Sequence, residues 1–344
     1  MNKTEDNVKL PRIEFEDIVS GEGRLNKDLN TKKDDRKGIF FDENNILYGK
    51  LRPYLRKWYY ARFAGVAIGD FWVLKIINNN HPLFIYYLIQ TEKYQRVAND
   101  TSGTKMPRSD WKKVSESLFY IPNINEQKKI STIFNIIDNL ITLHQRKLEQ
   151  LEQLKNTLLS KMFPKSGTNI PEIRFSGFTD AWKQRKLGDI TNSMSIKAYI
   201  SEIFEEGRYP VIQQGDNPIA GYADGNPFES YKDITLFGDH TLSLFKPDKE
   251  FFIASDGIKI LSPSISMDGV FYYYLLEKYK PKSEGYKRHF TILKKRKAKF
   301  PNYIEEEIKI GKILSGTDSL IIKYQYKIKK LKNMKQTLLN KMFI

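Results

Sequence analysis

The sequence predicts an α+β protein in which two similar β-rich modules are separated by two long antiparallel helices that form an intramolecular coiled coil. Three features carry this prediction: an internal repeat with pseudo-twofold character, two long heptad patterns of apolar residues, and short strand-like segments ahead of each pattern. A length of 344 residues also favours two domains over a single core.

The internal repeat is clearest at the ends of the two halves. TLLSKMF occupies residues 157–163 and TLLNKMF occupies residues 337–343, so the two phrases differ at one letter and lie 180 positions apart. Looser blocks follow in the same order: GTKMPRSDWKK (103–113) with GYKRHFTILKK (285–295), FIYYLI (84–89) with FYYYLL (271–276), and ILYGK (46–50) with TLFGD (235–239). A fixed order with slowly drifting offsets indicates a tandem duplication.

Each half ends in a heptad pattern that predicts a long helix, over residues 125–163 in the first half and 305–344 in the second. Apolar residues recur at steps of three and four, so each helix has one apolar face that its counterpart can cover. The expected positions for helix pairing and partner docking are Ile137, Ile141, Leu148, Leu151 and Leu158 in the first helix and Ile321, Ile328, Leu331 and Leu338 in the second. The alternative is two unrelated amphipathic helices, each packed on its own module.

The repeat and the helices divide the chain. A first module is expected at 1–124, a junction at 164–186, where Pro, Gly, Ser and Thr interrupt the helix, and a second module at 187–304. The first module is expected to be shortened at its N-terminus. Asp17 matches Asp216, which lies 45 residues after Pro171, whereas only sixteen residues precede Asp17.

The charge balance points to an anionic partner. Lys and Arg total 57 against 41 Asp and Glu, a formal net charge of +16, which favours nucleic acid first and a membrane surface second. The chain has no cysteine, which excludes disulfides, thiolate zinc sites and cysteine nucleophiles. Neither a signal peptide nor a long apolar run is evident, so a cytoplasmic protein is expected.

The order of these parts resembles the specificity subunit of bacterial type I restriction-modification systems. A β-rich module precedes a helix ending in LLSKMFP; PEIRFSGFTDAWKQRKLGDI (171–190) then leads into a second module and helix. The resemblance implies that each module is a target recognition domain reading one half of a bipartite DNA sequence. It also implies that the helices dock methyltransferase subunits, and that the restriction and translocation subunit joins that core.

The resemblance further implies a chain without catalytic machinery, cofactor or metal, and the motifs agree. The sequence has no G-x-x-x-x-G-K-[ST] phosphate loop, and DNPI (216–219) lacks the second Pro and the aromatic residue of an amino-methyltransferase motif. The few histidines are too scattered to argue for a metal site.

Candidate DNA-binding residues occur where basic and aromatic residues alternate without an acid. Segment 48–63 holds Lys50, Arg52, Arg56, Lys57 and Arg62, and segment 287–300 holds Lys287, Arg288, Lys294, Lys295 and Arg296, with Lys105 and Arg108 in its first-half counterpart. The alternative is that these aromatic residues are core and the charges merely solvated. For base recognition, Gln213 and Gln214 are the candidates for adenine, and Arg52, Arg108 and Arg288 for guanine.

Two other functions fit parts of this pattern. A basic coiled-coil adaptor would bind DNA weakly and without sequence preference. A nuclease with an unrecognised carboxylate site would cleave DNA in the presence of metal without any partner.

Overall fold

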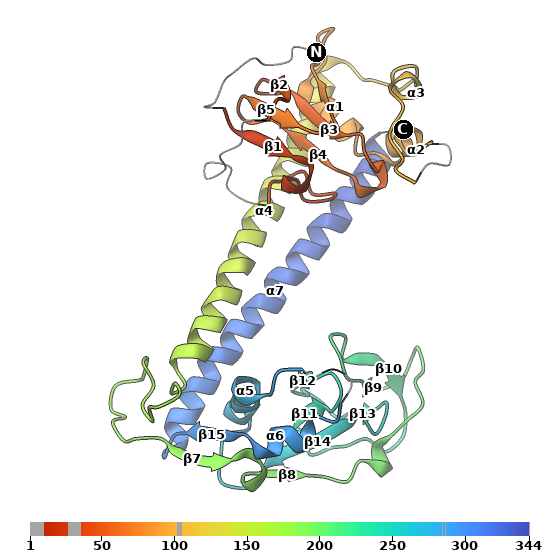
Figure 1. The fold of residues 1–344 in the computed structure, drawn as a ribbon. Helices are drawn as coiled ribbons and strands as arrows, with labels where there is room; N and C mark the ends of the chain where they lie inside the picture. The colour runs from red at the N-terminus through yellow and green to blue at the C-terminus, as the bar shows by residue number, and fades with distance from the viewer. Residues whose placement is uncertain (1–9, 27–35, 102–104, 284, 286, 344) are drawn as a thin grey trace. The chain divides into compact units, whose positions relative to one another are not determined.

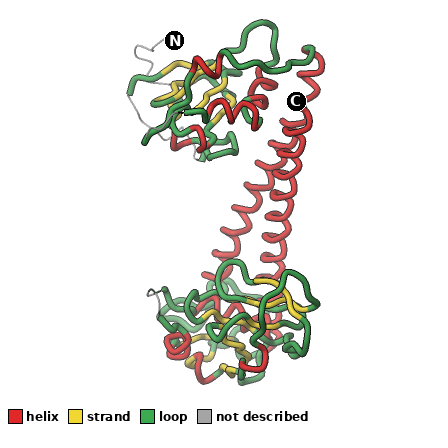
Figure 2. The backbone as a smooth tube through the Cα atoms, turned by 90° about the vertical axis from the view of Figure 1, so that its right-hand side faces the viewer, coloured by secondary structure: helices red, strands yellow, loops and turns green. Residues whose placement is uncertain are grey.

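The computed structural model describes residues 10–26, 36–101, 105–283, 285 and 287–343. The chain forms two compact units, Met1–Gln145 with Tyr326–Ile344 (unit 1) and Arg146–Gln325 (unit 2). Each unit combines a β-rich part with a stretch of both long helices (Figure 1). Figure 2 shows the strands of each unit gathered in that part and joined by extensive loops.

The described residues of unit 1 form two three-stranded sheets. One has the order β1 (Arg12–Glu14), β5 (Gly65–Ile68), β2 (Ile39–Phe41), and the other β4 (Trp58–Tyr60), β3 (Ile46–Gly49), β6 (Phe71–Leu74). The described residues of unit 1 also form short helices: η1 (Phe15–Asp17), η3 (Pro53–Leu55), α1 (Pro82–Leu88), α2 (Glu92–Ala98) and α3 (Trp111–Ser115). The aromatic-rich strands β3 and β4 are almost wholly buried, which is why this segment forms the core of the unit.

Unit 2 contains three sheets. Their orders are β10 (Ile219–Ala223), β9 (Tyr209–Ile212), β13 (Phe252–Ile253); β12 (Leu244–Phe245), β11 (Thr235–Gly238), β14 (Ile258–Pro263), β8 (Thr191–Ser193); and β15 (Lys297–Phe300), β7 (Lys183–Lys186). The short helices are η4 (Leu187–Asp189), η5 (Lys197–Tyr199), α5 (Gly269–Tyr279) and α6 (Phe290–Lys295).

The two units share strand pairings as well as sequence. In unit 1, β3 pairs antiparallel with β4 and β6, and in unit 2, β11 pairs antiparallel with β12 and β14. The parallel pairing of β1 with β5 sets Ile13 beside Ala67, and that of β9 with β13 sets Ile212 beside Ile253. Ile13 and Ile212 therefore hold the same place in the parallel pairing of each unit.

The long helices are α4 (Ile124–Lys161) and α7 (Ile304–Met342), and they lie antiparallel in each unit (Figure 1, Figure 2). In unit 1 the C-terminal part of α7 meets the N-terminal part of α4, where Leu339 shares a core with Ile130 and Phe134. In unit 2 the opposite parts meet, and Met162 shares a core with Leu314. The predicted fold, with its antiparallel helix pairing, is confirmed.

The predicted pairing positions of both helices are largely withdrawn from solvent. Of the predicted pairing positions, Ile137, Ile141, Leu151 and Ile328 are buried, and the others are half-buried: Leu148, Leu158, Ile321, Leu331 and Leu338. The position of Ile137 is taken in α7 by Thr317, whose hydroxyl donates to the Ile313 carbonyl at 2.9 Å and so needs no partner from outside its helix.

The β-rich part of each unit is fixed to a long helix by the same hydrogen bond. At the start of α1, the His81 N–H donates to Gln127 Oε1 at 2.8 Å, and at the start of α5 the Asp268 N–H donates to Glu307 Oε2 at 2.9 Å. Gln127 and Glu307 lie 180 positions apart. Each accepts a hydrogen bond from a backbone N–H that has no partner within its own helix.

The junction packs within unit 2. Trp182 is buried beside Phe163 and Phe271, with ring centroids 5.7 and 6.2 Å away. Arg174 makes a bidentate ion pair with the fully buried Glu306 of α7, with N···O distances of 2.7 and 2.9 Å. No helix among the described residues offers the uninterrupted apolar length that a bilayer crossing requires.

Candidate nucleic-acid interface

A crossing of three loop segments brings predicted DNA-binding residues of unit 1 together. The crossing consists of residues 50–52 after β3, 69–70 before β6, and 107–109 before α3. The Lys50 N–H donates to the Asp70 carbonyl at 2.9 Å, and the Lys50 carbonyl accepts from the Ser109 N–H at 2.8 Å. The Arg52 N–H donates to the Pro107 carbonyl at 2.7 Å. These backbone bonds fix the loops from which Lys50, Arg52 and Arg108 project.

Charge at this crossing is partly neutralised by Asp70. The Arg108 guanidinium donates two hydrogen bonds of 3.3 and 3.1 Å to the Asp70 carboxylate, and Lys50 Nζ lies 3.9 Å from the same carboxylate. Arg52 and Lys105 are exposed, and no described residue forms an ion pair with either of them. Arg52 and Lys105 are therefore the cations of this crossing best able to meet phosphates.

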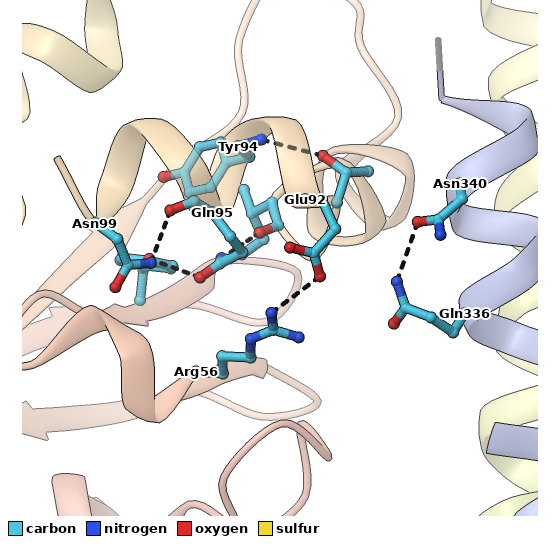
Figure 3. Close-up of polar contacts among 10 residues, drawn as sticks. Arg56, Glu92, Tyr94, Gln95, Asn99, Gln336 and Asn340 are labelled. Carbon is cyan, nitrogen blue, oxygen red and sulfur yellow. Dashed lines mark hydrogen bonds and ion pairs between the residues drawn. The ribbon is translucent and has the colours of Figure 1, made fainter. Parts of the chain in front are cut away.

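The other basic residues of segment 48–63 make contacts inside unit 1. Arg56 forms an ion pair with Glu92 of α2 at 2.9 Å, as Figure 3 shows. Lys57 Nζ donates to the Ile18 carbonyl and lies 5.4 Å from the centroid of the Phe15 ring. Arg62 donates to Asn135 of α4 at 2.9 Å. These three side chains point to different parts of the unit and do not join the crossing.

Unit 2 repeats the crossing. It is formed by residues 239–243 after β11, 255–257 before β14, and 287–289 before α6. The Asp239 N–H donates to the Gly257 carbonyl at 2.8 Å, and the Asp239 carbonyl accepts from the His289 N–H at 2.9 Å. The Phe290 N–H donates to Asp239 Oδ1 at 2.8 Å. Asp239 thus occupies the place of Lys50 in unit 1.

One of the two predicted glutamines, Gln214, contacts the crossing of unit 2, and Gln213 precedes it in the chain. Gln214 Oε1 accepts from the His240 N–H at 3.2 Å, and a Cβ atom on Gly257 would lie 2.6 Å from Gln214 Nε2. Glycine at 257 therefore leaves the room that the Gln214 side chain fills. Gln213 is exposed and donates to the Asn217 carbonyl at 2.9 Å. Of the two, Gln213 presents more of its amide to a partner.

The basic run 287–296 divides into two parts. Lys287 and Arg288 are exposed at the crossing, directly before His289. Lys294 and Lys295 are exposed at the end of α6, and the Arg296 carbonyl accepts from the Leu187 N–H of η4 at 2.8 Å. The later three residues therefore lie on the side of α6 that faces η4, beyond the three segments that form the crossing.

Sequence reasoning missed two residues of the unit 2 crossing, Lys259 and His240. Lys259 Nζ lies 3.9 Å from Asp239 Oδ2 and donates to the Asp256 carbonyl at 3.0 Å. Lys259 is the single charged residue of an apolar strand, so its sequence gives no sign of a site. It lies near the crossing because β14 pairs with β11, which sets Lys259 beside Phe237. In the described part of the chain, no three His, Cys, Asp or Glu side chains gather closely enough to hold a metal ion.

Comparison with known families identifies the class of protein. The model of the type I restriction modification DNA specificity domain matches residues 6–153 and, a second time, residues 179–333. The chain therefore belongs to this family, that of the specificity subunits of type I restriction-modification systems, and the resemblance seen in the sequence is confirmed.

Particular relatives agree with this assignment. The chain is 28% identical over 130 residues to the type I restriction enzyme MjaVIII specificity subunit of Methanocaldococcus jannaschii, covering 36% of this chain and 30% of that protein. It is also 28% identical over 127 residues to the EcoDI specificity subunit of Escherichia coli, covering 36% and 28%. Each match thus spans less than a third of the curated relative.

Solved structures share the fold. The S subunit of a type I restriction-modification system from M. genitalium matches with a TM-score of 0.70 at 18% identity, covering 98% of this chain and 89% of that one. A chain from a study of complex assembly in a type I system matches with a TM-score of 0.50 at 18% identity, covering 96% and 90%.

Proposed function

We propose that this chain is the non-catalytic DNA-reading subunit of a type I restriction-modification complex, with each unit reading one half of a bipartite target. The observation that carries the proposal is the repeated crossing. The crossing of unit 1 carries Lys50, Arg52 and Arg108; in unit 2, Asp239 holds the place of Lys50 and Arg288 the place of Arg108. The recognition domains are proposed at 1–124 and 187–304, the helices at 125–163 and 305–344, and the junction at 164–186.

The proposed division of labour at the crossing follows contact chemistry. Exposed cations such as Arg52, Lys105 and Arg288 suit phosphates, which set the position of the protein on the duplex without reading its sequence. Gln213 suits an adenine edge because its amide both donates and accepts. Arg108 is proposed to read guanine only after it releases Asp70, since the carboxylate already occupies both prongs of its guanidinium.

The proposed surface for methyltransferase docking is an exposed apolar stripe on the long helices, separate from their buried seam. On α4, Ile133, Ile136, Leu140 and Leu143 are spaced by three and four residues and are 42, 53, 39 and 60% exposed. On α7, Ile313 and Leu320 lie 180 positions after Ile133 and Leu140 and are 39 and 43% exposed. Apolar side chains left in water on one helical face favour a protein partner. We further propose that the restriction subunit joins the complex of this chain with the methyltransferase subunits. This complex is proposed to be cytoplasmic.

Selection from a random duplex library tests the proposed recognition. The chain, assembled with its methyltransferase subunit, is expected to enrich two short sequence blocks separated by a constant gap. Enrichment that disappears at moderate salt and leaves no motif would instead support the sequence-blind adaptor. Metal-dependent cutting of the library by the chain alone would support the nuclease.

Co-purification tests the docking stripe. The double substitution I133E/L140E is expected to abolish association with the methyltransferase subunit, because each change places a charge in an apolar contact. The matched control is Q153E, which adds a charge to an exposed position of the same helix away from the stripe. Equal recovery of the methyltransferase with both variants would remove the stripe from the proposal.

A further inference from the structure

One continuous segment closes the β-rich part of unit 2. Residues 182–193 run through β7, η4 and β8: β7 pairs with β15, and β8 pairs with the far edge of β14. Three apolar side chains of this segment are buried to 2% exposure or less: Trp182, Leu187 and Ile190. The segment therefore supplies two strands and three core side chains.

Unit 1 has the two edges that this segment covers in unit 2. Residues 118–121 precede Pro122 and Asn123 at the start of α4, as β15 precedes Pro301 and Asn302 at the start of α7. β6 corresponds to β14, because Gly49 faces Phe71 as Gly238 faces Ile258. The counterparts of the β14 residues that pair with β8 are therefore residues 74–76.

Neither edge has a strand beside it in the described residues of unit 1. β6 stands at the end of its sheet, in the order β4-β3-β6, whereas the corresponding sheet of unit 2 continues to β8. Residues 118–121 form no strand, although they lie in the place of β15. In unit 2 the single segment 182–193 covers both corresponding edges, so one neighbouring segment could cover both edges of unit 1.

The uncovered edges expose large apolar side chains. Leu118 is 89% exposed, Tyr120 82% and Ile77 69%. Ile121 is 44% exposed, whereas its counterpart Phe300 is 3% exposed. Ile121 is the position that a neighbouring strand would bury, because Leu118 and Tyr120 correspond to Lys297 and Lys299, which face solvent or are half-buried beside β7 in unit 2. An unpaired strand edge with such a position can be completed by another strand.

We propose that unit 1 binds, by β-augmentation, a segment of another polypeptide with the chemistry of residues 182–193. Such a segment has a Trp, a short basic strand, a Leu-Gly-Asp-Ile turn and a second short strand. The main-chain bonds would come from residues 118–121 and 74–76, and the Trp, Leu and Ile would be buried. Glycine is favoured in the turn because, in unit 2, a Cβ atom on Gly188 would lie 3.1 Å from Lys294 Cβ, a tight contact.

The register predicts which amides of unit 1 take part. In unit 2 the Leu187 N–H donates to the Arg296 carbonyl, so the alternation of an antiparallel ladder makes Ala298 and Phe300 the hydrogen-bonded positions. Their counterparts in unit 1 are Phe119 and Ile121. The proposal does not depend on DNA recognition and can fail or hold independently of it.

The test adds a fluorescent peptide of residues 171–193 to the full chain. We expect saturable binding, with slower amide exchange at residues 118–121 and 74–77 and no change at 297–300. A peptide with W182A and L187D is expected not to bind, because it loses two of the three buried side chains. Binding of this altered peptide as tightly as the parent would overturn the proposal.

Two variants of the chain distinguish binding by β-strand pairing from nonspecific binding to apolar side chains. I121P removes one ladder amide at a half-exposed position and should weaken binding about tenfold, whereas the control I121V keeps it. The variant L118K/Y120K gives unit 1 the lysines that β15 carries and should still bind the peptide. Loss of binding in L118K/Y120K with full binding in I121P would contradict the proposal, provided that both variants keep the parent far-ultraviolet spectrum.

Sedimentation identifies where the segment comes from. A chain dimer that the peptide disperses would support the proposal and assign the occupant to the same segment of a second copy. A monomeric chain that binds the peptide supports a segment from a different polypeptide. A dimer that the peptide leaves intact, with no exchange protection at 118–121, would refute it.

Discussion

Lys155 of α4 and Asp318 of α7 form an ion pair in unit 2, with 2.9 Å between Lys155 Nζ and Asp318 Oδ1. In unit 1 the helices exchange roles: Lys335 of α7 lies 2.7 Å from Asp138 of α4. Each lysine, like each aspartate, is 180 positions from its counterpart. The ion pair is therefore a duplicated feature of the helix pairing.

In each unit a tyrosine from the β-rich part also binds the aspartate of this ion pair, so that lysine, aspartate and tyrosine form a cluster. The Tyr274 hydroxyl donates to Asp318 Oδ2 at 2.7 Å, and the Tyr87 hydroxyl donates to Asp138 Oδ2 at 3.1 Å. The lysine ammonium groups lie 5.7 and 5.3 Å from the respective ring centroids, within reach of a cation–π interaction. Each cluster thus joins both long helices to the β-rich part of its unit.

The first prediction concerns the removal of one lysine. Burial opposes the charge of Lys155, but hydrogen bonds and attraction from Asp318 and Glu277 raise its pKa above the usual value. K155M leaves these two carboxylates without their cation, so it should lower the free energy of unfolding of unit 2 by about 1–3 kcal/mol. Urea unfolding followed by amide exchange in α5 measures the loss.

The control for K155M is K332M. Lys332 pairs with Glu22 at 2.7 Å, but its side chain is 43% exposed, so its loss should cost less than about 1 kcal/mol. Equal costs for the two substitutions would show that the Lys155 cluster does not hold the helices together.

The second prediction is a pH dependence centred on Glu307. Burial raises the pKa of this carboxyl to about 7, against the opposing effect of the hydrogen bond from the Asp268 N–H. Between about pH 4.5 and pH 7 the folded state therefore binds the proton more tightly than the unfolded state. The contribution of Glu307 to stability should be complete at acid pH and should be lost as the pH rises through 7.

Gln127 supplies the matched variant for this test. It holds the corresponding position in unit 1 and accepts the equivalent amide at 2.8 Å without a charge. E307Q should therefore stabilise unit 2 at pH 8 by about 1–2 kcal/mol relative to the parent and make little difference at pH 5. A difference that does not vary with pH would contradict the assignment.

The third prediction concerns the junction. Glu306 is fully buried, and its two carboxylate oxygens accept hydrogen bonds from Nε and Nη2 of Arg174. R174M leaves that carboxylate unpaired, and the cost should be about 3 kcal/mol in unit 2, measured by thermal unfolding of the full chain.

Two variants control this experiment. R174M/E306Q should recover part of the stability, because it removes the uncompensated charge. R208A should change little, since Arg208 and Asp224 form an ion pair whose side chains are 73 and 62% exposed. A double variant less stable than R174M would contradict the burial argument.

The fourth prediction tests the DNA contacts. R52A and R288A should each weaken binding to every duplex by a similar factor and reduce the salt slope of the assembled complex by about 1, because each removes one phosphate contact. K129A, at an exposed position on α4, is the control. Salt-titrated fluorescence anisotropy measures the slope, and an unchanged slope in R52A would place that side chain away from the phosphates.

The repeat made the architecture predictable from the sequence. A helix seam depends on periodic apolar residues, and two copies of one seam 180 positions apart imply that each can cover the other. Tyr87 and Tyr274 fall in the matched blocks FIYYLI and FYYYLL. The clusters they form with Asp138 and Asp318 depend on how α1 and α5 pack against the long helices and could not be read from spacing.

Side-chain direction limited the prediction of the interface. A basic segment reveals charge but not where each side chain points, and Arg56, Lys57 and Arg62 each meet a partner inside unit 1. The pattern LFYI at 118–121 is apolar enough for a buried strand, yet Leu118 and Tyr120 are exposed. Leu118 and Tyr120 lie where β15 of unit 2 carries Lys297, which is exposed, and Lys299, which is half-buried, so the direction in which these side chains point, and not their apolar character, decides their exposure.

Mapping methylated bases in cells that carry this chain with its methyltransferase subunit tests the central claim most directly. The account predicts a methylated motif of two blocks with a fixed gap, in which a Gln213→Ala substitution in unit 2 relaxes one block and leaves the other unchanged. A single uninterrupted motif, or a substitution in unit 2 that alters both blocks equally, would contradict the claim that each unit reads its own half.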